Sequence, residues 1–395
     1  MDQIVKRILE LSDPETALKK KVQVQQNELT INGSRFQFTK PLIISVGKAS
    51  VKMANFFITR LISYEAIIVK PKGDPSKPVG KALVMESSHP YPDESSFRAG
   101  QVVREALISL DYDLVIFLLS GGASSLLEDP VYSPEVYVDV MKRLVTSGLT
   151  IEEINVVRKH MSGVKGGRLG ALSKSKVVTL VISDVPGNDL DVVGSGPTLP
   201  DPSTVEDARA ILEKIGMSVP KLEETPKDLP NVSSYLIMDI REVLSPLANE
   251  LGGGILSSEV RGEAKFLGAF LASIINTQGI FKMPYTLLLG GEPEVTITGE
   301  RGKGGRNGEV CLSFLEWVRA PRFKLYAIAT DGVDGNSEYA GCIVDETFKI
   351  PRRRIEAALR HHSSYELLEQ IGATVKTGPL EPMLTTFTFL WLPET

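Results

Sequence analysis

The 395-residue sequence is poor in the residues that build metal and redox centres. It has two cysteines, Cys311 and Cys342, and four scattered histidines. Neither set has the spacing of a zinc site or of a redox-active cysteine motif. We therefore expect a protein of a reducing compartment without disulfides, in which each cysteine is a small core residue and not a nucleophile.

Long hydrophobic runs and an excess of positive charge are also missing. The most apolar stretch, 114–119, is far too short to span a bilayer, and the first residues lack the apolar core of a signal peptide. The formal net charge is −5, which gives no reason to expect a nucleic acid or an anionic membrane as partner. The sequence predicts a cytoplasmic protein with a small-molecule substrate.

Apolar runs of strand length alternate with helical patterns along the chain. In the first part, strands are predicted at 42–46, 66–69, 114–119 and 177–182. This alternation is typical of an α/β protein, and we expect a Rossmann-like, doubly wound, mostly parallel sheet with right-handed crossovers.

A segment rich in Pro, Lys and Glu at 219–231 then resembles a domain boundary. Further strands are predicted after it, at 235–238, 285–289, 325–329 and 386–391. We expect two α/β domains, at 1–230 and 231–395, with the active site in a cleft between them.

The most informative loop follows the predicted strand 177–182. Residues 183–198 contain the carboxylates of Asp184, Asp189 and Asp191 and the closely spaced Gly194 and Gly196. Open α/β sheets bind ligands at the carboxyl ends of their strands. Carboxylates there suit a polyanion held through a hard divalent cation. An ordinary turn with solvated acids is the alternative.

A second glycine-rich loop joins the buried run 114–119 to a predicted helix. Its glycines would let backbone N–H groups approach a phosphate, and its serines would supply further donors. The alternative is a tight turn with a serine cap. The loop is not a P-loop, because no Gly-x-x-x-x-Gly-Lys-Ser/Thr pattern occurs. The predicted anion-binding residues are Ser120, Gly121, Gly122, Ser124 and Ser125.

Two cationic and two acidic residues also lie in loops next to predicted strands or helices. Lys48 follows the strand 42–46, and Arg306 lies among glycines ahead of a predicted helix at 309–317. Arg306 is suited to bidentate binding of phosphate or carboxylate. A solvated surface lysine and a disordered basic turn are the alternatives. Asp331 and Asp334 follow the strand 325–329 as metal ligands, hydroxyl acceptors or Asx-turns.

Together these loops favour phosphoryl transfer over redox chemistry. Anion-binding loops, one lysine, one arginine and several carboxylates are what a reaction based on positioning and charge stabilisation needs, with Mg²⁺ bridging the phosphates. Hydride transfer would call for Gly-x-Gly-x-x-Gly with an acid about 20 residues on, and the sequence has no such arrangement.

Several short motifs occur in order along most of the chain. They are Ser88-His89-Pro90-x-Pro92-Asp93, Ser120-Gly121-Gly122-x-Ser124, the segment 183–202, Gly290-Gly291-Glu292, Gly304-Gly305-Arg306-Asn307-x-Glu309 and Thr330-Asp331-Gly332-x-Asp334-Gly335. Together they resemble one family, the glycerate 2-kinases that carry the MOFRL domain.

The resemblance implies ATP-dependent phosphorylation of D-glycerate, usually on the 2-hydroxyl, with Mg²⁺. Lys48 and Arg306 would contact the glycerate carboxylate or the transferring phosphate. Asp184 and Asp331 would handle the metal and the attacking hydroxyl, and Asp189 is a further candidate metal ligand. The loops 120–125 and 194–196 are the candidate ATP-binding segments. A homodimer is compatible with the sequence, which does not fix the oligomeric state.

The chain departs from the family pattern at several positions. Ser88 replaces a glycine, Asn188 an aspartate and Gly308 a glutamine, and Leu380-Glu381-Pro382-Met383 replaces a Thr-Gly-Thr-Asn turn after Thr377-Gly378-Pro379. Two other functions stay open. One is an NAD(P)H-dependent hydroxypyruvate reductase, a label that the family has carried. The other is a non-catalytic sensor of a phosphorylated ligand.

Overall fold

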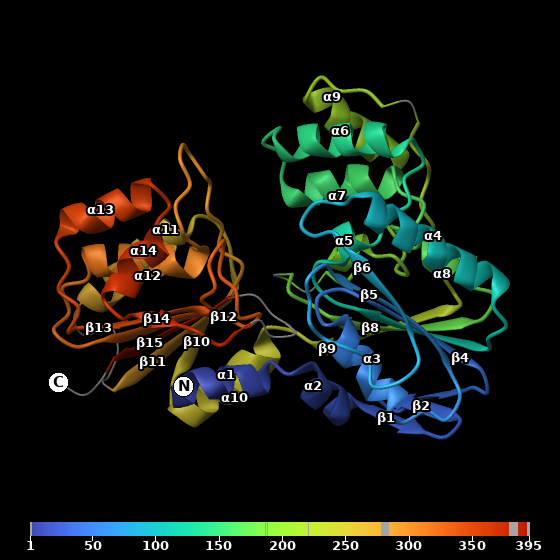
Figure 1. The fold of residues 1–395 in the computed structure, drawn as a ribbon, viewed down its shortest axis with the longest axis horizontal. Helices are drawn as coiled ribbons and strands as arrows, with labels where there is room; N and C mark the ends of the chain where they lie inside the picture. Colours follow the sequence, from blue (N-terminus) through green and yellow to red (C-terminus); the bar gives the residue numbers. More distant parts are fainter. Residues whose placement is uncertain are drawn as a thin grey trace. The chain divides into compact units, whose positions relative to one another are not determined.

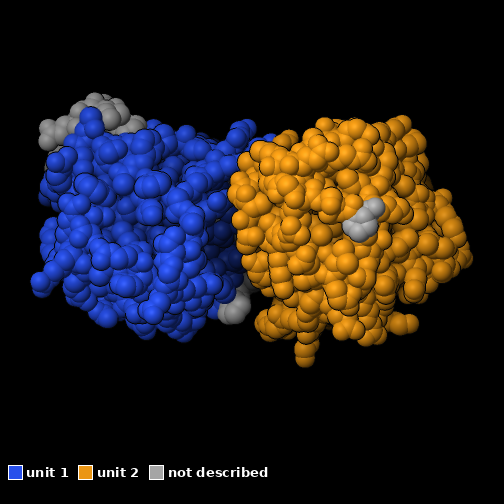
Figure 2. Space-filling view, turned by 90° about the horizontal axis from the view of Figure 1, so that it is seen from above, with its two compact units in different colours: residues 1–13, 184–188, 239–395 blue, residues 14–183, 189–238 orange. Residues whose placement is uncertain are grey.

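The computed structural model describes residues 2–185, 187, 189–219, 221–277, 284–378 and 386–392. The chain divides into two compact units, drawn in different colours in Figure 2. Unit 1 consists of residues 1–13, 184–188 and 239–395, and unit 2 of residues 14–183 and 189–238. Each unit contains its own six-stranded sheet.

The sheet of unit 2 confirms the predicted parallel α/β architecture. All of its neighbouring strands are parallel, in the order β6-β5-β4-β7-β8-β9. This is the doubly wound order, in which the direction of strand addition reverses between β4 and β7 and ligands bind at the carboxyl ends. Its strands are β4 (Pro41–Val46), β5 (Glu65–Pro71), β6 (Leu83–Ser87), β7 (Leu114–Leu119), β8 (Lys176–Ile182) and β9 (Val232–Met238).

Helices cover both faces of this sheet. Figure 1 shows α3 on one face and α4 and α8 on the other, and it shows α6, α7 and α9 as a layer of their own. That layer is held by a buried apolar cluster that includes Tyr137, Leu144, Val157 and Leu212. The helices are α2 (Pro14–Lys21), α3 (Ser50–Ile58), α4 (Glu94–Ser109), α5 (Ala123–Leu126), α6 (Pro134–Val145), α7 (Ile151–His160), α8 (Arg168–Leu172), the 3₁₀ turn η1 (Val193–Ser195) and α9 (Val205–Lys214).

The strand at 232–238 belongs to a different domain from the one that we expected. We placed it in the second domain, after a boundary at 230. In the structure β9 pairs in parallel with β8 and forms the edge of the first sheet. Unit 2 therefore extends to Met238. A boundary in a polar loop is visible in sequence, but the sheet to which the next strand adds is not.

Unit 1 is built on a mixed sheet with the order β10-β11-β15-β12-β13-β14. Only β10 and β11 pair in parallel; the other neighbours are antiparallel. Figure 1 shows α11 to α14 on one face and α1 and α10 on the other. The strands are β10 (Gly254–Val260), β11 (Tyr285–Gly291), β12 (Lys324–Ala329), β13 (Gly341–Asp345), β14 (Thr374–Val375) and β15 (Thr386–Leu392).

Helices α11 to α14 enclose an apolar core with one face of this sheet. The core includes Leu271 of α11, Phe314 of α12 and Tyr365 of α14. The helices are α1 (Gln3–Leu11), α10 (Arg241–Leu251), α11 (Ala264–Asn276), α12 (Arg306–Trp317), α13 (Arg352–Arg360) and α14 (Ser364–Gln370). A separate antiparallel sheet in unit 2 contains β1 (Val22–Gln25), β2 (Glu28–Ile31) and β3 (Ser34–Gln37).

The two cysteines are joined, contrary to our expectation of a protein without disulfides. Cys311 on α12 and Cys342 on β13 form a disulfide, and both residues are fully buried. They are 31 residues apart in the sequence. The packing of α12 against β13 brings them together, which no local spacing motif indicates. Among the described residues, no helix is long and apolar enough to cross a membrane.

Candidate functional site

The loops that follow β4, β7 and β8 meet at the carboxyl edge of the unit 2 sheet. The backbone N–H of Lys48 donates to the carbonyl oxygen of Gly121 at 2.9 Å. A Cβ added to Gly194 would lie 2.8 Å from the Cβ of Ala123, at the start of α5. The structure therefore brings together three segments that the sequence singled out, namely Lys48, the loop 120–125 and the turn 194–196.

Gly47 fixes the backbone of Lys48 against the loop 120–125. Its φ is 125°, which favours glycine, and an added Cβ would lie only 2.1 Å from Oγ of Ser120. The N–H of Ala49 donates to the same Oγ at 3.1 Å. Any larger residue at position 47 would push the two loops apart and move Lys48 with them.

The side chains of Lys48 and His89 both lie over Gly122. A Cβ added to Gly122, whose φ is 83°, would lie 3.0 Å from Cδ2 of His89 and 3.2 Å from Cγ of Lys48. Lys48 is half-buried and His89 is exposed. We did not predict His89 as a site residue. The signal was its place in the motif 88–93, which follows β6 at the same edge of the sheet.

Two of the three predicted serines are used inside the fold. Ser120 is 1% exposed, and its Oγ accepts the Ala49 N–H. Ser125 is also buried and donates to the carbonyl oxygen of Gly122 at 3.2 Å. Ser124 is half-buried, and its hydroxyl makes no hydrogen bond to another described residue. Ser124 is thus the hydroxyl of this loop best placed to meet a ligand.

The acidic loop after β8 has two distinct parts. Asp184 is half-buried directly after the strand and belongs to unit 1, whereas Asp189 is exposed and belongs to unit 2. Asn188, the position that departs from the family pattern, lies outside the described residues. Gly194 and Gly196 both have a φ of 58°, and the turn they form packs on α5. Contact of Gly194 and Gly196 with ATP stays a prediction.

Arg306 is the first residue of α12, three residues earlier than the helix start that we predicted. Its Nη1 donates to Oε1 of Glu292 at 2.8 Å, and its side chain is 20% exposed. Burial disfavours the charge, but Glu292 and Asp334 outweigh it and raise the pKa of Arg306. Arg306 is therefore an ordered, permanently charged group, and not part of a disordered turn. Glu292, which accepts this hydrogen bond, belongs to the motif Gly290-Gly291-Glu292, but we did not predict it as a site residue.

Asp334 caps the same helix from inside the unit. It is fully buried, and its Oδ2 accepts the N–H groups of Asn307 at 2.9 Å and Gly308 at 3.1 Å. The hydroxyl of Tyr365 donates to this oxygen at 2.7 Å. Burial raises the pKa of Asp334 to about 6. A buried carboxylate with three donors on one oxygen is a structural group that holds the start of α12.

Asp331, three residues earlier, is the accessible acid of the pair. It is half-buried, and its Oδ1 accepts the N–H of Val333 at 3.2 Å in a local turn. Its charge helps to raise the pKa values of both Arg306 and Asp334. Of the two acids that the motif offered, Asp331 therefore remains the candidate for chemistry.

A second buried pair lies further along α12. Nδ1 of His362 lies 2.8 Å from Oε1 of Glu309, and the N–H of Thr298 donates to Nε2 of His362 at 3.1 Å. Because Nε2 accepts, the imidazole proton belongs on Nδ1, where it is donated to Glu309. Burial raises the pKa of Glu309. Sequence reasoning missed this pair, because its members are 53 residues apart.

Comparison with known proteins agrees with these motifs. Residues 1–226 match a family model described as a domain of unknown function (DUF4147), and residues 285–383 match the MOFRL family. The chain is 52% identical to a glycerate 2-kinase of Sulfurisphaera tokodaii over 96% of each chain. It is 36% identical to a D-glycerate 2-kinase of Thermotoga maritima, over 95% of this chain and 94% of the relative. The chain belongs to the glycerate 2-kinase family.

Solved structures extend the similarity to the fold. A crystal structure of glycerate kinase from Thermotoga maritima superposes with a TM-score of 0.85 at 34% identity, and it covers 99% of this chain and 98% of that one. The atypical segment Leu380–Met383, where this member departs from the family pattern, lies outside the described residues. Any contact that it makes stays a prediction.

Single carboxylates after β8 are of the kind that can bind a magnesium ion together with a nucleotide. Among the described residues, no three His, Cys, Asp or Glu side chains gather as a metal site. Mg²⁺ commonly uses one or two carboxylates together with phosphate oxygens and water. The half-buried Asp184 and the exposed Asp189 offer hard oxygen ligands of that kind.

Proposed function

We propose that this chain is an ATP-dependent kinase that phosphorylates D-glycerate on its 2-hydroxyl. One observation carries the proposal. In a chain of this family, Lys48, Gly122 and the turn 194–196 meet at the carboxyl edge of a doubly wound sheet. That edge is where such folds bind phosphorylated ligands.

The unit 2 loops would bind the phosphates of ATP. The glycines of the loop 120–125 leave the backbone open to a phosphate, and Ser124 adds a hydroxyl donor. Lys48 would place its ammonium beside the transferring phosphoryl group, whose negative charge must be stabilised during transfer. His89, which lies beside Gly122 as Lys48 does, would cover the loop at Gly122.

The unit 1 residues would bind and activate the acceptor. Arg306 keeps one Nη1 bond to Glu292 and has further N–H donors for the carboxylate of glycerate. Asp331 would accept the proton of the attacking hydroxyl. Asp184 and Asp189 would hold Mg²⁺, which supplies charge neutralisation on the phosphates.

The test is a product analysis with ATP, Mg²⁺ and D-glycerate. We expect 2-phosphoglycerate, separated from 3-phosphoglycerate by chromatography or by ³¹P NMR. 3-Phosphoglycerate would contradict the assigned hydroxyl. Oxidation of NADH with hydroxypyruvate would instead identify a reductase, and tight ligand binding without turnover would identify a sensor.

A further inference from the structure

The turn 194–196 has a backbone that needs outside support. Gly194, Ser195 and Gly196 have φ values of 58°, 61° and 58°. The glycines adopt such values readily, but Ser195 is strained there. Strained residues of this kind persist only where the surrounding structure holds them, and they gather at functional sites.

The support comes from two side chains one turn apart on α7. Oγ of Ser195 donates to Oδ1 of Asn155 at 3.2 Å. Nζ of Lys159 donates to Oδ2 of Asp191 at 2.9 Å. Asp191 in turn packs against the strained turn, because a Cβ on Gly196 would lie 2.8 Å from its carbonyl oxygen. A lysine only 4% exposed is therefore directed at the loop that ends in this turn.

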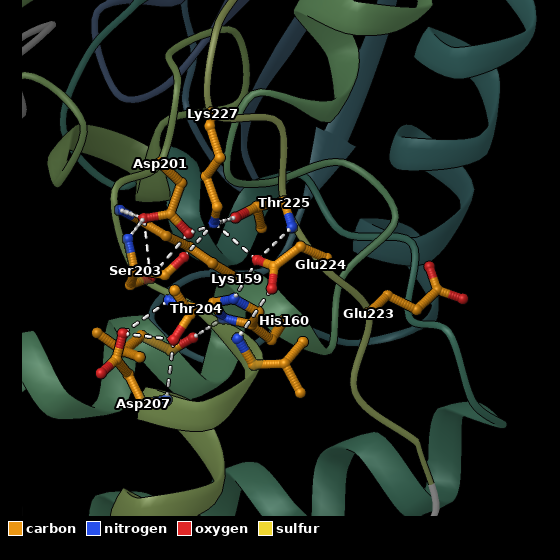
Figure 3. Close-up of polar contacts among 12 residues, drawn as sticks. Lys159, His160, Asp201, Ser203, Thr204, Asp207, Glu223, Glu224, Thr225 and Lys227 are labelled. Carbon is orange, nitrogen blue, oxygen red and sulfur yellow. Dashed lines mark hydrogen bonds and ion pairs between the residues drawn. The ribbon is translucent and has the colours of Figure 1, made fainter.

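Lys159 has a second partner that anchors it away from the turn. Its Nζ lies 3.2 Å from Oδ1 of Asp201, which is 1% exposed. Asp201 also accepts hydrogen bonds from Oγ of Ser203 at 2.9 Å and from Oγ1 of Thr225 at 3.0 Å (Figure 3). Burial opposes the charge of Asp201, but Lys159 and these hydroxyls outweigh it and lower its pKa. Asp201 is thus the anchored partner of Lys159, and Asp191 is the partner through which Lys159 contacts the turn.

The strained turn in turn supports the loop that contacts Lys48. Gly194 packs on Ala123 and on Leu119, so the turn lies directly behind the start of α5. Backbone bonds complete its support, since the N–H groups of Gly166 and Gly167 donate to the carbonyl oxygens of Ser195 and Gly196 at 3.0 and 2.7 Å. A shift of the turn would therefore move the loop 120–125.

We propose that Lys159 is a positioning residue for nucleotide binding: through Asp191 it holds the turn 194–196, and the turn holds the loop 120–125 in its phosphate-binding shape. The proposal rests on the proposed function only in taking this loop as the ATP site. Lys159 does not contact the nucleotide. Its effect is expected on ATP affinity and not on the glycerate side of the reaction.

Two variants test the contact between Lys159 and Asp191 directly. Lys159→Met removes the ammonium. Asp191→Asn weakens the same contact from the other side, and because the Asp191 side chain is 32% exposed we expect this variant to fold even if Lys159→Met does not. We expect each to raise the Kd for ATP, measured by titration calorimetry, by about tenfold or more, the scale of losing a residue that orients a functional group from behind. The KM for ATP should rise in step, while the KM for D-glycerate stays within about twofold.

Two control variants separate positioning from stability. Thr225→Val removes a hydrogen bond from the anchored carboxylate Asp201 without touching Asp191. Lys214→Met breaks an exposed ion pair between Lys214 at the end of α9 and Glu153 on α7, the helix that also carries Lys159. Both should leave the Kd for ATP unchanged, although Thr225→Val should lower Tm. The double variant Lys159→Met/Asp191→Asn should bind ATP no more weakly than Lys159→Met alone.

The outcomes distinguish this proposal from the proposed function. Unchanged ATP affinity in Asp191→Asn would overturn the positioning role, as would equal changes in the two KM values. A wild-type protein that does not bind ATP would overturn it as well. A wild-type protein that binds ATP but does not phosphorylate glycerate would contradict only the proposed function, and the calorimetric comparison would still decide the role of Lys159.

Discussion

The hydroxyl of Tyr365 donates to Oδ2 of Asp334 at 2.7 Å in the interior of unit 1. Both residues are fully buried, and burial raises the pKa of Tyr365 well above its usual value. The tyrosine therefore stays protonated and remains a donor. The same Oδ2 holds the N–H groups that begin α12, so the pair Tyr365–Asp334 connects α14 to the helix start that carries Arg306.

The titration of Asp334 should be visible in the stability of the protein. Its pKa is about 6 in the folded state and near 3.8 ordinarily. A raised carboxyl pKa contributes stability that is fully present below the unfolded value and is lost as pH rises through the folded value. We expect the free energy of unfolding of wild type, relative to Asp334→Asn, to fall by about 3 kcal/mol between about pH 4 and about pH 7.

Urea denaturation of both proteins across this pH range measures the difference. Asp334→Asn lacks the titrating group, so the comparison removes the contributions of other residues such as Glu309. A difference that is flat with pH, or that grows as pH rises, would show that Asp334 is ionised throughout.

Replacement of Arg306 should cost activity even when the charge is kept. Arg306→Lys cannot pair bidentately with a carboxylate or phosphate. We expect both Arg306→Ala and Arg306→Lys to lower kcat/KM for D-glycerate by about 100-fold or more, the scale of a lost charge-stabilising contact. Steady-state kinetics measure this, with Arg353→Lys on the exposed face of α13 as the control. Turnover near wild type in Arg306→Lys would mean that only the local charge matters.

Lys48 should be important for rate and unimportant for stability. Truncation of a solvated lysine changes stability by no more than about 0.5 kcal/mol. Lys48 is half-buried, so Lys48→Ala should lower Tm only slightly, while turnover falls steeply because the ammonium stabilises the transferring phosphoryl group. Lys77→Ala, at an exposed lysine of the same unit, should retain both. Normal turnover in Lys48→Ala would remove the β4 loop from the active site.

Metal removal should abolish turnover. The candidate ligands Asp184 and Asp189 are hard oxygen donors, which suit Mg²⁺ or Mn²⁺. We expect activity to vanish in EDTA and to return on adding back either ion. Asp184→Asn should mimic the loss at saturating Mg²⁺ while keeping part of the ATP affinity through the loop 120–125. Full activity after exhaustive chelation would contradict this.

The disulfide between Cys311 and Cys342 should stabilise unit 1. It closes a loop between residues 31 apart in sequence, for which chain entropy predicts about 3 to 4 kcal/mol. The double variant Cys311→Ala/Cys342→Ala should lose stability on this scale in urea denaturation, and a reductant should have no further effect on it. Alkylation of free thiols in unreduced, denatured wild type would show that the bond does not form.

The sequence by itself predicted the buried central strands of the unit 2 sheet and the loops that follow them. The runs 114–119 and 177–182 are apolar at nearly every position, because strands buried on both faces have no polar side. The structure confirms them as neighbouring parallel strands. The glycines at 47, 122 and 194 follow such strands, and each is required by a close backbone or side-chain approach. These features are encoded locally, in hydrophobicity and in the absence of a side chain.

Short or exposed strands escaped prediction for the opposite reason. The strands β1 to β3 have four residues each, and β10 exposes Ile255 and Leu256 at the edge of its sheet. With no continuous buried run, their sequences do not differ from those of loops. Their pairing is decided by the neighbouring strand.

Pairing between distant residues was decided by the tertiary structure alone. Asp331 and Asp334 are three residues apart in one motif, yet one stays accessible and the other is buried beneath α12. Lys159 is an ordinary helical lysine in sequence and becomes a buried tie to Asp191 and Asp201, 32 and 42 residues away. The sequence determined which chemical groups stand at the strand ends. Burial and long-range contact, which depend on the whole packed chain, decided which of those groups support the structure and which remain accessible for chemistry.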